Sequence, residues 1–152
     1  MAERTGFTPD KSGTREAWTK LTAQVPLDDP RLTDGPSAYV FIPQEQIKVD
    51  TLWVGLAVRE FGDVPDGIET LEISGGLCVS ARVYGDEAHM WKVYDAIFAW
   101  LEQSPEYEMD RSEGVLGMET VPFKPFNALT IPYPDIETFS FTILYPVRKK
   151  SP

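Results

Sequence analysis

One acidic residue, Glu119, occurs in an apolar segment, where its chemistry depends on whether the side chain is buried. The segment is VLGMETVP, residues 115–122. A carboxylate moved from water into a low-dielectric site either takes up a proton or pairs with a positive group. Few lysines and arginines lie nearby in the sequence, so a cation supplied by a ligand is the partner that we expect. The alternative is that Glu119 faces solvent on the side of the strand opposite Met118.

Aromatic side chains could complete such a site, because a ring face attracts a quaternary or delocalised cation by about 0.5–2 kcal/mol. The chain has four tryptophans, six tyrosines and eight phenylalanines, an ordinary number for its length. We expect Phe98 and Phe139 to pack in the core with Met90, Ile97 and Leu101. For the other rings, core packing and ligand contact both stay open. With Glu119, the candidate ligand-binding residues are Trp18, Tyr39, Trp53, Trp91, Tyr94, Phe141 and Tyr145.

Signatures of catalysis and metal binding are absent from the sequence. His89 is the single histidine, which excludes a site built from several histidines. The SGG of residues 74–76 lacks the Lys-Ser/Thr that follows a phosphate-binding loop. The lone cysteine, Cys78, excludes an internal disulfide and is interpreted as a small apolar residue in a strand. We therefore expect no metal, no cofactor and no catalytic residue, although catalysis through Glu119 stays open.

Composition and charge indicate one soluble, acidic domain that covers residues 1–152. The formal net charge of −10 argues against nucleic acid as a direct partner, because phosphate binding needs clustered lysine and arginine. No apolar run has the ~20 residues of a membrane helix, and the N-terminal residues lack the apolar run of a signal peptide. These features predict a cytoplasmic protein. The acidic bias of residues 51–110 either enriches cations near the surface or serves solubility.

Hydrophobic periodicity predicts two helices and several strands. The helices are expected at 14–25 and 87–103, the second with Asp86 as its N-cap. The expected extended segments are 38–43, 51–60, 68–73, 77–84, 114–122 and 136–147. Turn-rich connections are expected at 28–37 and 123–135, and a frayed tail at the C-terminus. Helices do not alternate with single strands, so the sequence favours an antiparallel α+β sheet with both helices on one face.

The ordered set of motifs resembles the GyrI-like effector-binding domains. The segment ETLEISGGLCVSARVYGDEAHMWKVYDAIFAWLEQSP, residues 69–105, is similar to the second half of such domains. Upstream, WVGLAV at 53–58 is similar to a family strand, and downstream LGMETVP places Glu119 at the family's glutamate. The resemblance covers about residues 14–147. Val121 stands where the family often has tyrosine, and the strand expected before the first helix is missing or compressed into RTGFT, residues 4–8.

The resemblance implies a fold and a function. The fold would be two β-α-β-β units with a cleft between the halves. Family members are the drug-sensing halves of MerR-type and AraC-type transcription regulators, or stand-alone gyrase-inhibitory and integron-cassette proteins. Those that bind several drugs hold lipophilic cations in an aromatic pocket with a buried glutamate, the role that Glu119 would take. We therefore predict a stand-alone domain that senses or sequesters a lipophilic, cationic compound. The alternatives are an acidic protein-interaction module of the gyrase-inhibitor type and a small hydrolase of reactive compounds.

Overall fold

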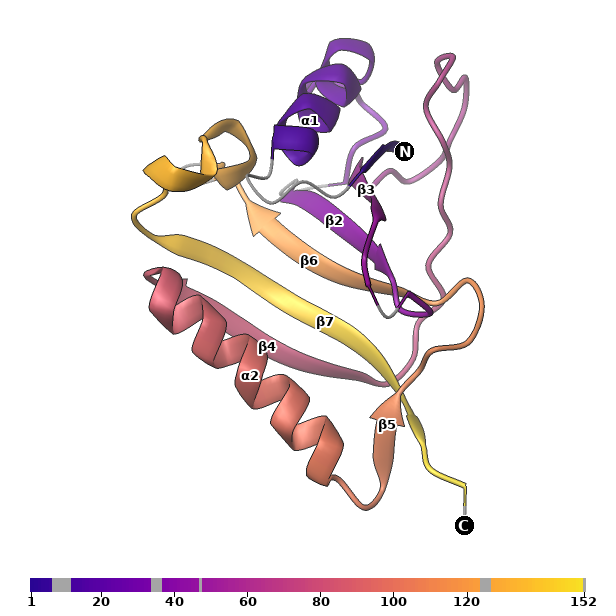
Figure 1. The fold of residues 1–152 in the computed structure, drawn as a ribbon. Coiled ribbons are helices and arrows are strands. Elements are labelled where there is room, and N and C mark those ends of the chain that lie inside the picture. Colours follow the sequence, from indigo (N-terminus) through magenta and orange to yellow (C-terminus); the bar gives the residue numbers. More distant parts are fainter. Residues whose placement is uncertain (7–11, 34–36, 47, 124–126, 152) are drawn as a thin grey trace.

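The structure, a computed structural model, describes residues 1–6, 12–33, 37–46, 48–123 and 127–151 (Figure 1). Parts of the expected connections at 28–37 and 123–135, the end of the RTGFT segment and the last residue of the expected tail lie outside these ranges. The described elements are β1 (Ala2–Gly6), α1 (Ser12–Gln24), β2 (Ser37–Pro43), β3 (Thr51–Leu56), β4 (Cys78–Gly85), α2 (Glu87–Gln103), β5 (Tyr107–Met109), β6 (Leu116–Pro122), the 3₁₀ turns η1 (Ala128–Thr130) and η2 (Tyr133–Asp135), and β7 (Phe139–Lys149).

The described strands form one seven-stranded antiparallel sheet. Its main path runs β1-β3-β2-β6-β7-β4, and β5 pairs with the far end of β7. β2 and β6 lie at the middle and pair over their whole lengths, from Ser37 with Pro122 to Pro43 with Leu116. The α+β class, the antiparallel sheet and the two helices are therefore confirmed.

One face of the sheet carries the core, and we call it the helix face. Strand pairing places Val54 beside Val40, Val40 beside Glu119, and Glu119 beside Ile143, so all four side chains point to this side. Val54 and Ile143 are fully buried there.

Both helices pack on the helix face. Trp18 of α1 lies 5.6 Å from the ring of Phe123, which continues the alternation of β6 on this side. Tyr94 of α2 lies 6.3 Å from the ring of Phe141, which pairs on this side with Val83 of β4. The opposite face carries Tyr39, Phe41 and other residues of the alternate parity, and we call it the outer face.

Local sequence explains where α2 begins and ends. The Asp86 side chain accepts a hydrogen bond from the backbone N–H of His89 at 2.8 Å, and Ser104 caps the other end just before Pro105. Met90, Ile97 and Leu101 lie on the side facing the sheet and are buried, as expected. Burial of each such side chain contributes roughly 1.5–3 kcal/mol relative to exposure. Phe98 was expected in the core but is 47% exposed, because it lies beside this stripe and not within it.

Two strand expectations were wrong. Residues 68–73 form no strand; Glu69 alone makes a bridge, with Ala2. At the start of the chain, β1 pairs with β3 along its whole length, although AERTG shows no apolar alternation. A strand at the edge of a sheet needs only a partner for its backbone, so polar side chains do not prevent it.

Neither of the helices in the described residues is long and apolar enough to cross a membrane.

Candidate ligand-binding site

Glu119 lies near the middle of the sheet, on the helix face. Its strand β6 runs between β2 and β7, and Glu119 pairs with Val40 on one side and Ile143 on the other. Val121, two residues along the same strand, is buried on the same face. The side chain of Glu119 is itself partly buried. The sheet thus holds a carboxylate among apolar neighbours, and the alternative that Glu119 points to open solvent is wrong.

The hydroxyl of Tyr94 donates a hydrogen bond to Oε1 of Glu119. Tyr94 comes from the middle of α2, so this contact ties the helix to the sheet. Burial raises the pKa of Tyr94 far above its ordinary value of 10.0, and the negative charge of Glu119 raises that pKa further. Tyr94 is therefore a neutral hydrogen-bond donor throughout the physiological pH range.

Aromatic rings surround this pair. The ring of Trp91 lies 5.7 Å from that of Tyr94, which in turn lies 6.3 Å from Phe141. Tyr145, which packs 6.3 Å from the ring of Phe98, has its pKa raised by burial and by the charge of Glu119. Trp91 is 48% exposed, so this end of the cluster is open to solvent.

Tyr133 belongs to the same cluster, and sequence reasoning missed it. It lies in η2, with its ring 5.7 Å from Phe139, and its hydroxyl is hydrogen-bonded to the side chains of Glu87 and Trp91. Burial, followed by the charge of Glu87, raises the pKa of Tyr133. The indole N–H of Trp91 also lies 3.3 Å from Oε1 of Glu87. The available signal was the stretch IPYPD, where two prolines fix a tyrosine just before the last strand.

The structure brings together five of the eight residues proposed from the sequence: Glu119, Trp91, Tyr94, Phe141 and Tyr145. We call these five residues with Tyr133 and Glu87 the Glu119 cluster. Trp18 lies on the same face, but it packs in the core against Phe123 and is only 5% exposed.

Trp53 and Tyr39 lie on the outer face, away from the Glu119 cluster. Trp53 pairs with Phe41, its indole N–H donates to Glu69 at 3.0 Å, and the guanidinium of Arg4 lies 5.3 Å from its ring centre. Tyr39 stacks on Phe41 with ring centres 5.9 Å apart. The expectation that Trp53 converges with Trp91 and Glu119 is wrong. Val54 points to the helix face, and successive side chains of a strand point to opposite faces, so Trp53 points to the outer face.

The cluster offers a carboxylate, phenolic donors and ring faces, which suits a positively charged organic group. Within the described ranges, no group of three or more His, Cys, Asp or Glu residues is arranged to hold a metal ion.

Comparison with protein-family models, with curated proteins and with solved structures found no significant match. The geometry of the chain is therefore the basis for the functional argument.

Proposed function

We propose that this protein binds a lipophilic, cationic small molecule at the Glu119 cluster, and so senses or sequesters that compound. The observation that carries the proposal is the partly buried carboxylate of Glu119, which is held by Tyr94 at the centre of a sheet and ringed by aromatic side chains. A cation placed there is attracted by the charge of Glu119, a carboxylate that is partly withdrawn from solvent. Each well-placed ring adds about 0.5–2 kcal/mol.

The topology supports a duplicated fold of the GyrI-like type. In the first half of the chain the strands are ordered β1-β3-β2, and in the second half they are ordered β4-β7-β6. The first half runs β1, α1, β2, β3 along the chain. The second half runs β4, α2, β6, β7, with the short strand β5 between α2 and β6. The two halves meet at β2 and β6, next to Glu119. We propose that they descend from one β-α-β-β unit and that the ligand enters a cleft between them on the helix face.

A pair of ligands that share phenyl rings on phosphorus but differ in charge tests this function. Tetraphenylphosphonium is a lipophilic cation, and triphenylphosphine oxide is a neutral molecule built from the same rings. We expect Glu119→Gln to weaken tetraphenylphosphonium by roughly 1–3 kcal/mol, because it removes a charge-assisted contact and keeps the side-chain shape. Triphenylphosphine oxide should bind equally well to both proteins. Isothermal titration calorimetry measures both affinities.

Glu102→Gln provides the control, because it removes an exposed carboxylate from α2 and should change neither affinity. An equal loss for both ligands in Glu119→Gln would show that the substitution damaged the fold. Unchanged binding of tetraphenylphosphonium would place Glu119 outside the site and overturn the proposal.

The hydrogen bond between Tyr94 and Glu119 favours one second candidate, hydrolysis of a reactive electrophile. A carboxylate can accept a proton from water, and the phenol of Tyr94 could donate to the developing negative charge once its hydrogen bond is transferred from Glu119 to the substrate. The same variant separates the two functions. A hydrolase would turn over an epoxide substrate in the wild type and lose turnover in Glu119→Gln, whereas a binding protein shows no turnover.

A further inference from the structure

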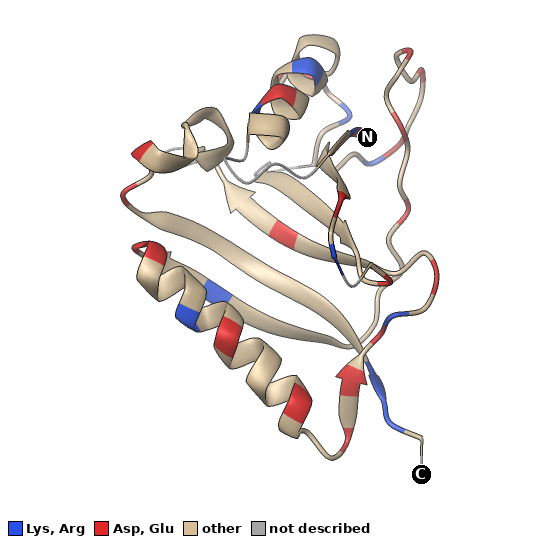
Figure 2. Cartoon of the chain, in the orientation of Figure 1, with Lys and Arg blue, Asp and Glu red and all other residues tan. Residues whose placement is uncertain are grey.

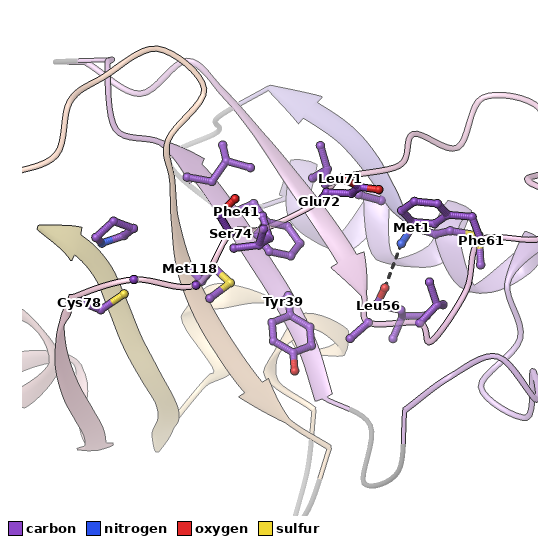
Figure 3. Close-up of a pocket in the computed structure, with 18 residues that line it drawn as sticks. Met1, Tyr39, Phe41, Leu56, Phe61, Leu71, Glu72, Ser74, Cys78 and Met118 are labelled. Carbon is purple, nitrogen blue, oxygen red and sulfur yellow. Dashed lines mark hydrogen bonds between the residues drawn. The ribbon is translucent and has the colours of Figure 1, made fainter.

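A cavity of about 640 Å³ lies on the outer face of the sheet (Figure 3). Its floor includes Tyr39, Phe41 and Met118, all on the outer parity of β2 and β6. Met118 precedes Glu119 in the same strand, so the two side chains point to opposite faces. The cavity is therefore separated from the Glu119 cluster by the thickness of the sheet.

Residues 69–77, which we call the covering segment, form one side of this cavity, and residues 71–76 line it. The segment is fixed at both ends. Ala2 and Glu69 exchange two backbone hydrogen bonds of 2.8 and 2.9 Å, and Leu77 accepts one of 3.0 Å from Val147. Between these anchors, no backbone hydrogen bond joins residues 70–76 to any other described part of the chain. Leu71 and Ile73 of this stretch line the cavity, and the backbone hydrogen bonds that hold the segment lie at its two ends.

The lining of the cavity defines the kind of molecule that fits. Most of the wall is aliphatic or aromatic, and Glu72, an exposed residue, is the only charged side chain among the described residues that line it. The rings of Tyr39 and Phe41 lie within 8° of parallel and offer a flat apolar surface. Ile73 lines the cavity and is still 41% exposed, so a bound apolar molecule would remove more of its surface from water. The volume is within the range of about 300–1,000 Å³ that is usual for small-molecule sites.

We propose that this cavity is a second binding site, for an uncharged, apolar, ring-containing small molecule. The negative charge of the chain disfavours anions there, and Glu72, the one carboxylate among the described lining residues, is exposed to solvent, in contrast to the partly buried Glu119. The proposal is independent of the function assigned to that cluster.

The four methionines allow the site to be located in the wild-type protein. Met1 and Met118 line the cavity, Met90 is a buried residue of α2, and Met109 lies in β5. The probe is N-phenyl-1-naphthylamine, which is neutral and fluoresces in apolar surroundings. In protein with ¹³C-labelled methionine methyl groups, saturating probe should shift the Met118 and Met1 signals and leave the Met109 signal in place. A shift confined to Met90 would put the probe on the helix face and overturn the proposal.

Three variants give an independent reading of the same binding. Ala57→Phe adds a ring inside the cavity and should weaken the probe by roughly tenfold or more, because the added ring takes the ligand's volume. Ser80→Phe adds the same ring on the outer parity of β4, at a residue that does not line the cavity, and should leave the affinity unchanged. Glu119→Gln should also leave it unchanged. Equal effects of Ala57→Phe and Ser80→Phe, or the absence of saturable binding to the wild type, would overturn the proposal.

Discussion

At the scale of single residues, the Glu119 cluster depends on one phenol that stays protonated. Burial and the adjacent carboxylate both oppose ionisation of Tyr94, so its pKa is raised far above 10.0 in the folded protein. In the unfolded chain the same phenol loses its proton near the ordinary value. The folded state therefore binds more protons than the unfolded state above pH 10, and the stability from this difference decreases as the pH rises.

Substitution of Tyr94 by phenylalanine tests this account. Below pH 10 the free energy of unfolding should be nearly independent of Tyr94 ionisation. Above it, the wild type should lose about 1.4 kcal/mol per pH unit for each tyrosine that is held neutral in the folded state. Tyr94→Phe removes one such contribution and should lower the slope by that amount, while Tyr145 keeps its own. Urea unfolding between about pH 8 and pH 11 measures the slope.

Tyr84→Phe is the matched control, since Tyr84 is 67% exposed on β4, and this variant should keep the wild-type slope. Identical slopes in Tyr94→Phe and the wild type would mean that Tyr94 ionises in the folded protein, and the hydrogen bond to Glu119 would then not persist at high pH.

At the scale of elements, Arg31 connects two loops that carry no regular structure. Its Nε and NH2 atoms donate to Asp29 at 3.0 and 2.7 Å, and its NH1 atom donates to the backbone carbonyls of Phe61 and Asp63 at 2.6 and 2.7 Å. This ion pair lowers the pKa of Asp29 to about 2. Phe61 lines the outer-face cavity, so the contacts of Arg31 also fix one wall of that cavity.

Arg31→Lys should lower the urea midpoint of unfolding measurably, because a single ammonium group cannot reproduce a planar fork that serves a carboxylate and two carbonyls. The amide of Arg59, which donates to the Arg31 carbonyl at 2.9 Å, should exchange faster with solvent. Arg148→Lys changes an exposed ion pair with Glu108 and should cost less than about 0.5 kcal/mol. Equal losses in the two variants, measured by chemical denaturation, would refute the connecting role of Arg31.

The same scale shows what the sequence could predict. Helix 87–103 was predicted at its observed bounds, because Asp86, the apolar stripe and Pro105 act locally. Residues 68–73 carry the apolar residues of an expected strand because Ile68 is buried and Leu71 and Ile73 line a cavity. The pattern of apolar residues indicates which side chains contact apolar surface. It does not indicate whether a neighbouring strand is placed to form backbone hydrogen bonds with the segment. The edge strand β1 shows the converse, since its backbone is paired although its side chains are polar.

The candidate site was predictable to a similar extent. Glu119 and the rings of α2 and β7 could be inferred because each lies in a regular element with an apolar side. The misplacement of Trp53 was avoidable, because the buried Leu52, Val54 and Leu56 share one parity of β3 and leave Trp53 on the other. The position of Tyr133 could not be predicted from hydrophobic periodicity, because the loop that carries it has no periodic pattern. Only the folded chain shows that this loop returns to the first turn of α2.

At the scale of the whole molecule, a net charge of −10 acts on any cation, wherever it binds. Acidic residues are spread over α2, β5 and several loops; basic residues lie on α1, β4, α2 and loops, with a group at the C-terminal end of β7 (Figure 2). Such a field attracts cations from a distance, but salt screens it. The charge of one partly buried carboxylate in contact with a ligand is screened much less.

The dependence of affinity on salt concentration therefore distinguishes two functions. One is ligand binding at the Glu119 cluster, and the other is the protein-interaction alternative, which would depend on attraction by the acidic surface. Raising sodium chloride from about 0.1 M to about 1 M shortens the Debye length from about 10 Å to about 3 Å. The affinity for tetraphenylphosphonium should then fall in both the wild type and Glu119→Gln, because both lose the same long-range attraction. The ratio of their two Kd values should change by less than about twofold, since that ratio isolates the contact with Glu119. Titration calorimetry of the two proteins at the two salt concentrations gives this ratio directly.

A ratio that falls to one at high salt would mean that the cation is held by the surface field alone, and the acidic protein-interaction function would then account for the chain better than a ligand site.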